Sequence, residues 1–194
     1  MPFQKPSKSY QAYIFDCDGT LADSMESHYV SWVEAFKKNK AKFHFDHELF
    51  ISMGGITLIE TVKILNQKYG DNLSPEQVVI DKEKIYMEQI HHTTAKDDVV
   101  EFAKELARAG KKVAVASGGT RHTVHKTLEY LGIKELFPVI LTQEDVVNGK
   151  PAPDIFLLAA ERLGAKAKDS VVFEDSGNGF KAAENAGMDY VKVT

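Results

Sequence analysis

The fold of this 194-residue chain is indicated most clearly by the stretch Ala12-Tyr13-Ile14-Phe15-Asp16-Cys17-Asp18-Gly19-Thr20. Four apolar residues are followed at once by two aspartates and a glycine. A short and wholly apolar run is typical of a strand that is buried on both faces of a parallel sheet. Ligands bind beyond the carboxyl ends of such strands, so the two aspartates stand where chemistry is expected.

Four later stretches share this apolar, β-branched texture, and each follows a segment with helical periodicity. They are residues 113–116, 139–141, 171–173 and 190–193. Strands that alternate with helices build parallel sheets that are covered by helices on both faces. We therefore predict an α/β fold with a Rossmann-like parallel sheet at its centre.

The strand texture disappears directly after the first strand. Apolar residues there, such as Trp32 and Phe36, recur at helical spacing. We predict two domains: an α/β core of residues 1–23 and 95–194, and a small helical cap of residues 24–94 inserted after the first strand. The connectors between them are short and span residues 22–24 and 93–96.

Polar residues suited to one reaction follow each of the first four predicted strands. They are Asp16 and Asp18, then Ser117 and Gly118, then Lys150, and finally Glu174 and Asp175. Each of these residues alone has an ordinary explanation, since Asp-x-Asp is common and lysine is usually a surface residue. Their joint placement at one edge of the sheet predicts an active site for phosphoryl transfer.

The chemical types fit the needs of that reaction. Of Asp16 and Asp18, one can attack phosphorus while the other exchanges a proton with the leaving oxygen. Clustered carboxylates repel each other unless a cation lies among them, and Mg²⁺ prefers such oxygen ligands. Ser117 and the backbone N–H of Gly118 suit a phosphate oxygen. Lys150 supplies positive charge to the transferring group.

The four segments together resemble the motifs of the haloacid dehalogenase superfamily of aspartate-nucleophile phosphotransferases. The motifs are Asp16-Cys17-Asp18-Gly19-Thr20-Leu21, Ser117, Lys150-Pro151 and Glu174-Asp175-Ser176, and they cover nearly the whole chain. The resemblance implies that Asp16 forms an aspartyl-phosphate and that Asp18 is the acid/base. It also implies Mg²⁺ held by Asp16, the backbone carbonyl of Asp18 and Asp175, with Glu174 nearby. Thr20, within the first motif, is counted among the phosphate-binding residues.

The position of the helical insert is similar to the cap of the β-phosphoglucomutase-like subgroup. The mutases carry a cap arginine for the second phosphate of the substrate, whereas residues 54–59 here offer no charged side chain. We therefore predict a Mg²⁺-dependent phosphatase of small phosphate monoesters, with sugar phosphates foremost. A β-phosphoglucomutase-type isomerase is the alternative, in which Lys63, Asn66 or Lys68 replaces the arginine. A binding protein without activity is the third hypothesis.

The composition excludes several other classes of function. The net charge is −4, with 24 basic residues scattered among 28 acidic ones, which argues against nucleic acid as a partner. No apolar run approaches the roughly 20 residues that span a bilayer, and residues 1–11 lack the apolar centre of a signal peptide. Cys17 is the single cysteine. We expect a cytoplasmic monomer whose partner is a small phosphorylated metabolite.

Overall fold

The computed structural model describes residues 4–194, so the first three residues of the predicted core lie outside the described part. The helices are α1 (Met25–Lys38), α2 (His47–Ser52), α3 (Leu58–Tyr69), α4 (Pro75–Gln89), α5 (Asp97–Arg108), α6 (Arg121–Tyr130), α7 (Asp154–Arg162) and α8 (Gly177–Asn185). The strands are β1 (Ala12–Phe15), β2 (Ala22–Asp23), β3 (Thr94–Ala95), β4 (Lys112–Ala116), β5 (Val139–Leu141), β6 (Ser170–Glu174) and β7 (Asp189–Lys192). Among residues 4–194, no helix is long and apolar enough to cross a membrane.

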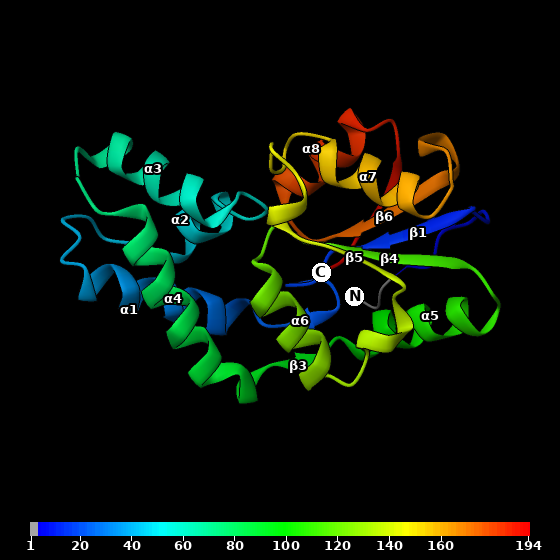
Figure 1. The fold of residues 1–194 in the computed structure, drawn as a ribbon, viewed down its shortest axis with the longest axis horizontal. Helices are drawn as coiled ribbons and strands as arrows, with labels where there is room; N and C mark the ends of the chain where they lie inside the picture. Colours follow the sequence, from blue (N-terminus) through cyan, green and yellow to red (C-terminus); the bar gives the residue numbers. More distant parts are fainter. Residues whose placement is uncertain (1–3) are drawn as a thin grey trace.

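Five strands form one parallel sheet in the order β5-β4-β1-β6-β7. Helices α5 and α6 cover one face of this sheet, and α7 and α8 cover the other (Figure 1). The central strand β1 supplies both layers: Tyr13 and Phe15 join the apolar cluster under α5 and α6, whereas Ile14 joins the cluster under α7 and α8. The predicted fold class is confirmed, and all five predicted strands are present.

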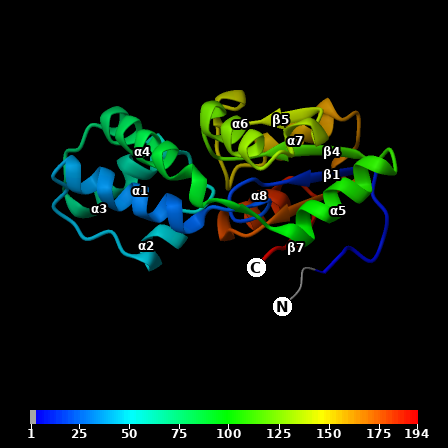
Figure 2. The same cartoon turned by 90° about the horizontal axis from the view of Figure 1, so that it is seen from below.

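Helices α1 to α4 form a separate helical body beside the sheet (Figures 1 and 2). This body has an apolar core of its own, which includes Trp32, Phe36, Val62 and Val78. Its helix starts follow local rules, since Ser74 caps α4 by accepting the backbone N–H of Gln77. The assignment of residues 24–94 to an independent cap domain stays a prediction, but we use the words core and cap for the two bodies.

The two connectors between core and cap pair with each other, which the sequence did not predict. Strands β2 and β3 form an antiparallel ladder that sets Ala22 opposite Ala95 and Asp23 opposite Thr94. The backbone N–H of Lys96 then donates to the carbonyl of Leu21 over 2.9 Å. Both crossings between the two bodies therefore lie at a single place, directly after the Asp16–Thr20 loop.

The aromatic stack on the sheet generates a test of the core. The rings of Phe15 and Phe173 lie 4.4 Å apart on neighbouring strands, and both side chains are fully buried. We expect Phe173→Ala to lower the free energy of unfolding by about 3–5 kcal/mol, because it removes buried apolar surface and leaves a cavity. Urea denaturation measures the change. The control is Leu157→Ala on α7, where 42% of the side chain is exposed and the expected loss is small. Equal losses in the two variants would contradict this account of the core.

Candidate active site

The ends of β1 and β6 bring three carboxylates together. Suitable oxygens of Asp16, Glu174 and Asp175 all lie within 4.8 Å of one another. Strands β1 and β6 are hydrogen-bonded neighbours, so the residues that follow them must lie side by side. The ammonium group of Lys150 closes the group, with Nζ at 2.6 Å from Asp16 Oδ1 and 2.7 Å from Glu174 Oε1. The structure therefore assembles four of the residues that the sequence predicted as one site.

The charges in this acidic cluster are strongly coupled. Burial raises the pKa of Asp16 well above its usual range, and Glu174 and Asp175 add to the rise while Lys150 opposes it. Burial and the neighbouring Glu174 raise the pKa of Asp175 to about 7. For Lys150, burial lowers the pKa, but the two carboxylates outweigh burial and raise it. Such a concentration of buried acid groups beside one lysine is the usual setting of a cation or of catalysis.

Two glycines allow the carboxylates to approach the backbone this closely. Gly19 has φ +81°, and a Cβ there would overlap the carboxyl group of Asp175. A Cβ at Gly179, in the first turn of α8, would overlap the carboxyl group of Glu174. That space lets Glu174 accept the backbone N–H and the hydroxyl of Ser176, at 2.6 and 2.9 Å.

The donor set of the cluster fits a hard divalent cation. Asp16, Glu174 and Asp175 offer carboxylate oxygens only, which are the ligands that Mg²⁺ takes. The side chain of Asp18 is not in the cluster, so only its backbone carbonyl stays a predicted ligand. Thr20 is fully buried, does not line the cavity, and its hydroxyl lies 3.4 Å from Asp175 Oδ1. The phosphate-binding role of Thr20 stays a prediction.

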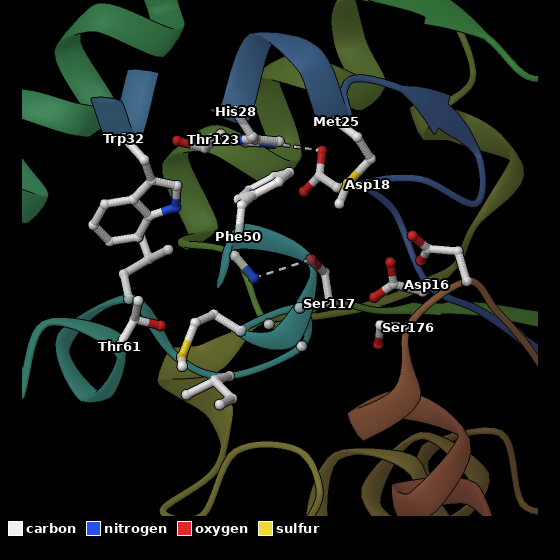
Figure 3. Close-up of a pocket in the computed structure, with 18 of the residues that line it drawn as sticks. Asp16, Asp18, Met25, His28, Trp32, Phe50, Thr61, Ser117, Thr123 and Ser176 are labelled. Carbon is white, nitrogen blue, oxygen red and sulfur yellow. Dashed lines mark hydrogen bonds and ion pairs between the residues drawn. The ribbon is translucent and has the colours of Figure 1, made fainter. Parts of the chain in front are cut away.

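Asp18 points away from the cluster and toward the cap (Figure 3). Its Oδ1 accepts the hydroxyl of Ser24 at 2.7 Å and lies 2.9 Å from His28 Nε2. The other ring nitrogen, Nδ1, lies 3.0 Å from Lys82 Nζ. Because an ammonium group only donates, Nδ1 is the acceptor, and the ring hydrogen lies on Nε2. Nε2 is close to Asp18, but the two atoms do not have the geometry of a hydrogen bond. Burial works to raise the pKa of Asp18, but His28, Ser24 and Lys82 outweigh it and hold the pKa at about 2.

The contacts continue from Lys82 through Glu83 to the core. Lys82 Nζ lies 2.8 Å from Glu83 Oε1, and Glu83 Oε2 accepts the hydroxyls of Thr120 and Thr123 at the start of α6. The sequence analysis did not predict a role for Lys82 and Glu83, because charged residues of a helix usually face solvent. A signal was present, because Lys82 lies four residues from both Val78 and Tyr86, which are fully buried.

The predicted phosphate-binding loop follows β4. Ser117 is buried, and its Oγ accepts the backbone N–H of Gly119 at 3.0 Å, so the hydroxyl hydrogen is directed elsewhere. Gly118 lies against the cap, since a Cβ there would stand 3.0 Å from the carbonyl oxygen of Gly55. Ser117 and Gly118 line one cavity with Asp16 and Asp18, opposite Trp32 and Phe50 of the cap (Figure 3).

The candidate replacements for the missing cap arginine do not reach this cavity. Lys63 and Lys68 are exposed, and the side-chain amide of Asn66 bonds to the backbone of Leu73. Arg121 pairs with Asp145 on the surface. Trp32 belongs to the apolar core of the cap, as predicted, and in addition lines the cavity.

Comparison with known families decides the affiliation. Residues 13–193 match the haloacid dehalogenase-like hydrolases, which is almost the whole chain. The chain belongs to that family. The resemblance inferred from the motifs is therefore confirmed.

Individual relatives of this haloacid dehalogenase-like hydrolase agree with the assignment. It is 28% identical to fructose-1-phosphate phosphatase YqaB of Escherichia coli over 95% of this chain and 96% of the relative. It is 34% identical to (DL)-glycerol-3-phosphatase 2 of Arabidopsis thaliana, in a match that covers 93% of this chain and 78% of the relative. Among solved structures, β-phosphoglucomutase of Clostridium difficile matches with a TM-score of 0.80 and 26% identity. The match covers 93% of this chain and 83% of that structure.

Gly19 offers a test of the acidic cluster. We expect Gly19→Ala to displace the carboxyl group of Asp175 and to abolish the rise in melting temperature that added Mg²⁺ produces in the unaltered protein. The matched control is Gly187→Ala, at φ +68° with no atom within 4 Å of the added Cβ. Both variants carry the cost of a left-handed alanine, about 1–2 kcal/mol, but only the first disturbs the cluster. An undiminished Mg²⁺ effect in Gly19→Ala would contradict this account of the cluster.

Proposed function

We propose that this hydrolase is a Mg²⁺-dependent phosphatase that hydrolyses small phosphate monoesters, sugar phosphates foremost, through an aspartyl-phosphate on Asp16. The observation that carries the proposal is the opposed placement of two carboxyl groups around one cavity. Asp16 lies in the acidic cluster beside Lys150, whereas Asp18 contacts His28 of the cap, and both line the cavity. Relatives named as phosphatases of fructose 1-phosphate and glycerol 3-phosphate support the reaction class.

In the first half of the reaction, an oxygen of Asp16 attacks phosphorus and the bond from phosphorus to the ester oxygen breaks. Ser117, the Gly118 N–H and Lys150 stabilise the charge on the transferring group. Asp18 takes up a proton from solvent as the substrate binds and gives this proton to the leaving oxygen. Asp18 is ionised before substrate enters, with a pKa of about 2, and the arriving phosphate anion favours its protonated form because like charges repel.

In the second half, water replaces the alcohol. Asp18 takes a proton from this water, whose oxygen attacks phosphorus while the bond to Asp16 breaks. Inorganic phosphate leaves and the Asp16 carboxylate is restored. The hydroxyl of Ser24, which donates to Asp18, and the nearby ring of His28 keep that carboxylate oriented for both proton transfers.

The cation belongs on the acidic cluster. Asp16, Asp175 and the backbone carbonyl of Asp18 would hold Mg²⁺, and Glu174 would stay beside Lys150. When bound, Mg²⁺ supplies positive charge to the phosphate oxygens and relieves the repulsion among the carboxylates.

The β-phosphoglucomutase-type isomerase is the weaker alternative. The solved relative of that name favours it. An isomerase that works through a bisphosphate must neutralise a second phosphate on the cap side. Among the described residues, no arginine lines the cavity, and the cap segment that follows Gly55 contributes Ile56 and Leu58. The lining of the cavity therefore fits hydrolysis better than isomerisation.

The nucleophile assignment has a direct test. We expect Asp16→Asn to reduce phosphate release from sugar phosphates by a thousandfold or more (~10³), because the amide cannot form the acyl phosphate. A screen of phosphate release with and without Mg²⁺ finds the substrate on which this is measured. Asp154→Asn, at the start of α7 and outside the lining of the cavity, is the control and should retain activity. Full activity in Asp16→Asn would reject the nucleophile.

The Lys82–Glu83 contact predicts a second kinetic effect. We expect Glu83→Gln to lower kcat about tenfold with a smaller change in KM, because the charge that orients Lys82, and through it His28 and Asp18, is lost. The control is Glu88→Gln, an exposed residue of the same helix. A loss of melting temperature without a change in kcat would assign Glu83 a purely structural role.

A further inference from the structure

We infer that the alcohol released from the substrate is small and uncharged, and that the cap discriminates against esters that carry a second anionic group. The inference rests on the proposed function and narrows it to a substrate class. It follows from the lining of the cavity between cap and core, which measures about 100 Å³. Pockets for drug-sized ligands occupy roughly 300–1,000 Å³, so the space suits a compact ester.

The cap wall of the cavity is largely apolar. Six side chains from the cap face the space beyond the predicted phosphate position: Met25, Trp32, Phe50, Met53, Ile56 and Leu58. In Figure 3, Met25, Trp32 and Phe50 stand across the cavity from Ser117. A charged group pressed against such a wall loses its hydration without gaining a counter-charge, which disfavours its binding.

The cations near the cavity are already paired. Lys82 is buried, and its Nζ lies 2.8 Å from Glu83 and 3.0 Å from His28 Nδ1. Lys150 is buried between Asp16 and Glu174. Lys82 is the one lysine or arginine among the described residues of the lining, and five carboxylates line the same space. An anionic alcohol would therefore meet no unpaired cation among the described residues of the cap side, where Glu83 balances Lys82.

A neutral polar group finds a partner. Trp32 lines the cavity, and its indole nitrogen faces the cavity in Figure 3. One hydroxyl or carbonyl oxygen of the alcohol can accept this N–H while its carbon skeleton lies against Phe50 and Met25. The wall thus accommodates a polyol but offers no unpaired cation to a carboxylate or a second phosphate.

The apolar wall is held in place by the core. The side-chain amide of Asn178 on α8 donates to the carbonyl of Gly54 at 2.8 Å. The backbone N–H of Leu58 donates to Gln143 Oε1 at 3.3 Å. These contacts fix the segment that carries Ile56 over the cavity, so a new charge introduced there would act directly on the substrate.

Matched substrates test the inference. Glycerol 3-phosphate and 3-phosphoglycerate share a three-carbon skeleton and differ by a hydroxymethyl group against a carboxylate. We expect kcat/KM for the neutral ester to be on the order of a hundredfold higher, in line with the cost of an unpaired buried charge. Similar values for both esters would overturn the inference while leaving the phosphatase proposal intact. Titration calorimetry on Asp16→Asn with the same two esters compares their affinities without turnover, and equal affinities would also overturn it, even if no ester is hydrolysed.

A variant pair tests the cause. Ile56→Arg adds a cation to the cap wall, and Ile56→Gln adds polarity of similar length without charge. We expect Ile56→Arg alone to raise kcat/KM for 3-phosphoglycerate, by about tenfold. Melting temperatures verify that both variants fold. An equal effect of arginine and glutamine, or no effect of either, would overturn the electrostatic explanation.

Discussion

The ion contacts of Lys150 are the constraint on which the rest of the site depends. One buried ammonium group lies between Asp16 and Glu174, while Asp175 stands beside them. Without compensating positive charge, three carboxylates could not share so small a buried volume. The parallel pairing of β1 with β6 brings the carboxylates together, and Gly19 and Gly179 leave the room for them. Sheet, loops and lysine thus serve one electrostatic arrangement, which a bound divalent cation would complete.

The second carboxyl group of the first motif connects this arrangement to the cap. Asp18 contacts Ser24 and His28, and the contacts continue through Lys82 and Glu83 to the start of α6. The proposed acid/base is therefore oriented by residues that lie on the cap, and the cap is oriented by hydroxyl groups of the core. A cap that moved away would break the Glu83 contacts and release His28 from Asp18 together. The contact between cap and core and the orientation of Asp18 therefore depend on the same residues.

The sequence was sufficient for the sheet and for most of the candidate site. The stretch Ala12–Phe15 is a strand to the residue, because an apolar run between polar neighbours has only one favourable environment. The carboxylates could be placed because strand ends of a parallel sheet share an edge. The β2–β3 ladder escaped prediction, since two-residue strands carry no periodicity. The contacts of Lys82 and Glu83 escaped prediction for another reason: their partners are distant in sequence, and only the relative placement of cap and core reveals them.

The central claim is that Asp16 carries the phosphoryl group during turnover. Rapid acid quench of the enzyme while it hydrolyses glycerol 3-phosphate, or the best ester found in a screen, followed by mass spectrometry of its peptides, tests this most directly. The account predicts the mass of one added phosphoryl group on the peptide that contains Asp16, and its absence from Asp16→Asn. Steady release of phosphate with no phosphorylated peptide, or with the phosphoryl group on a different residue, would contradict it.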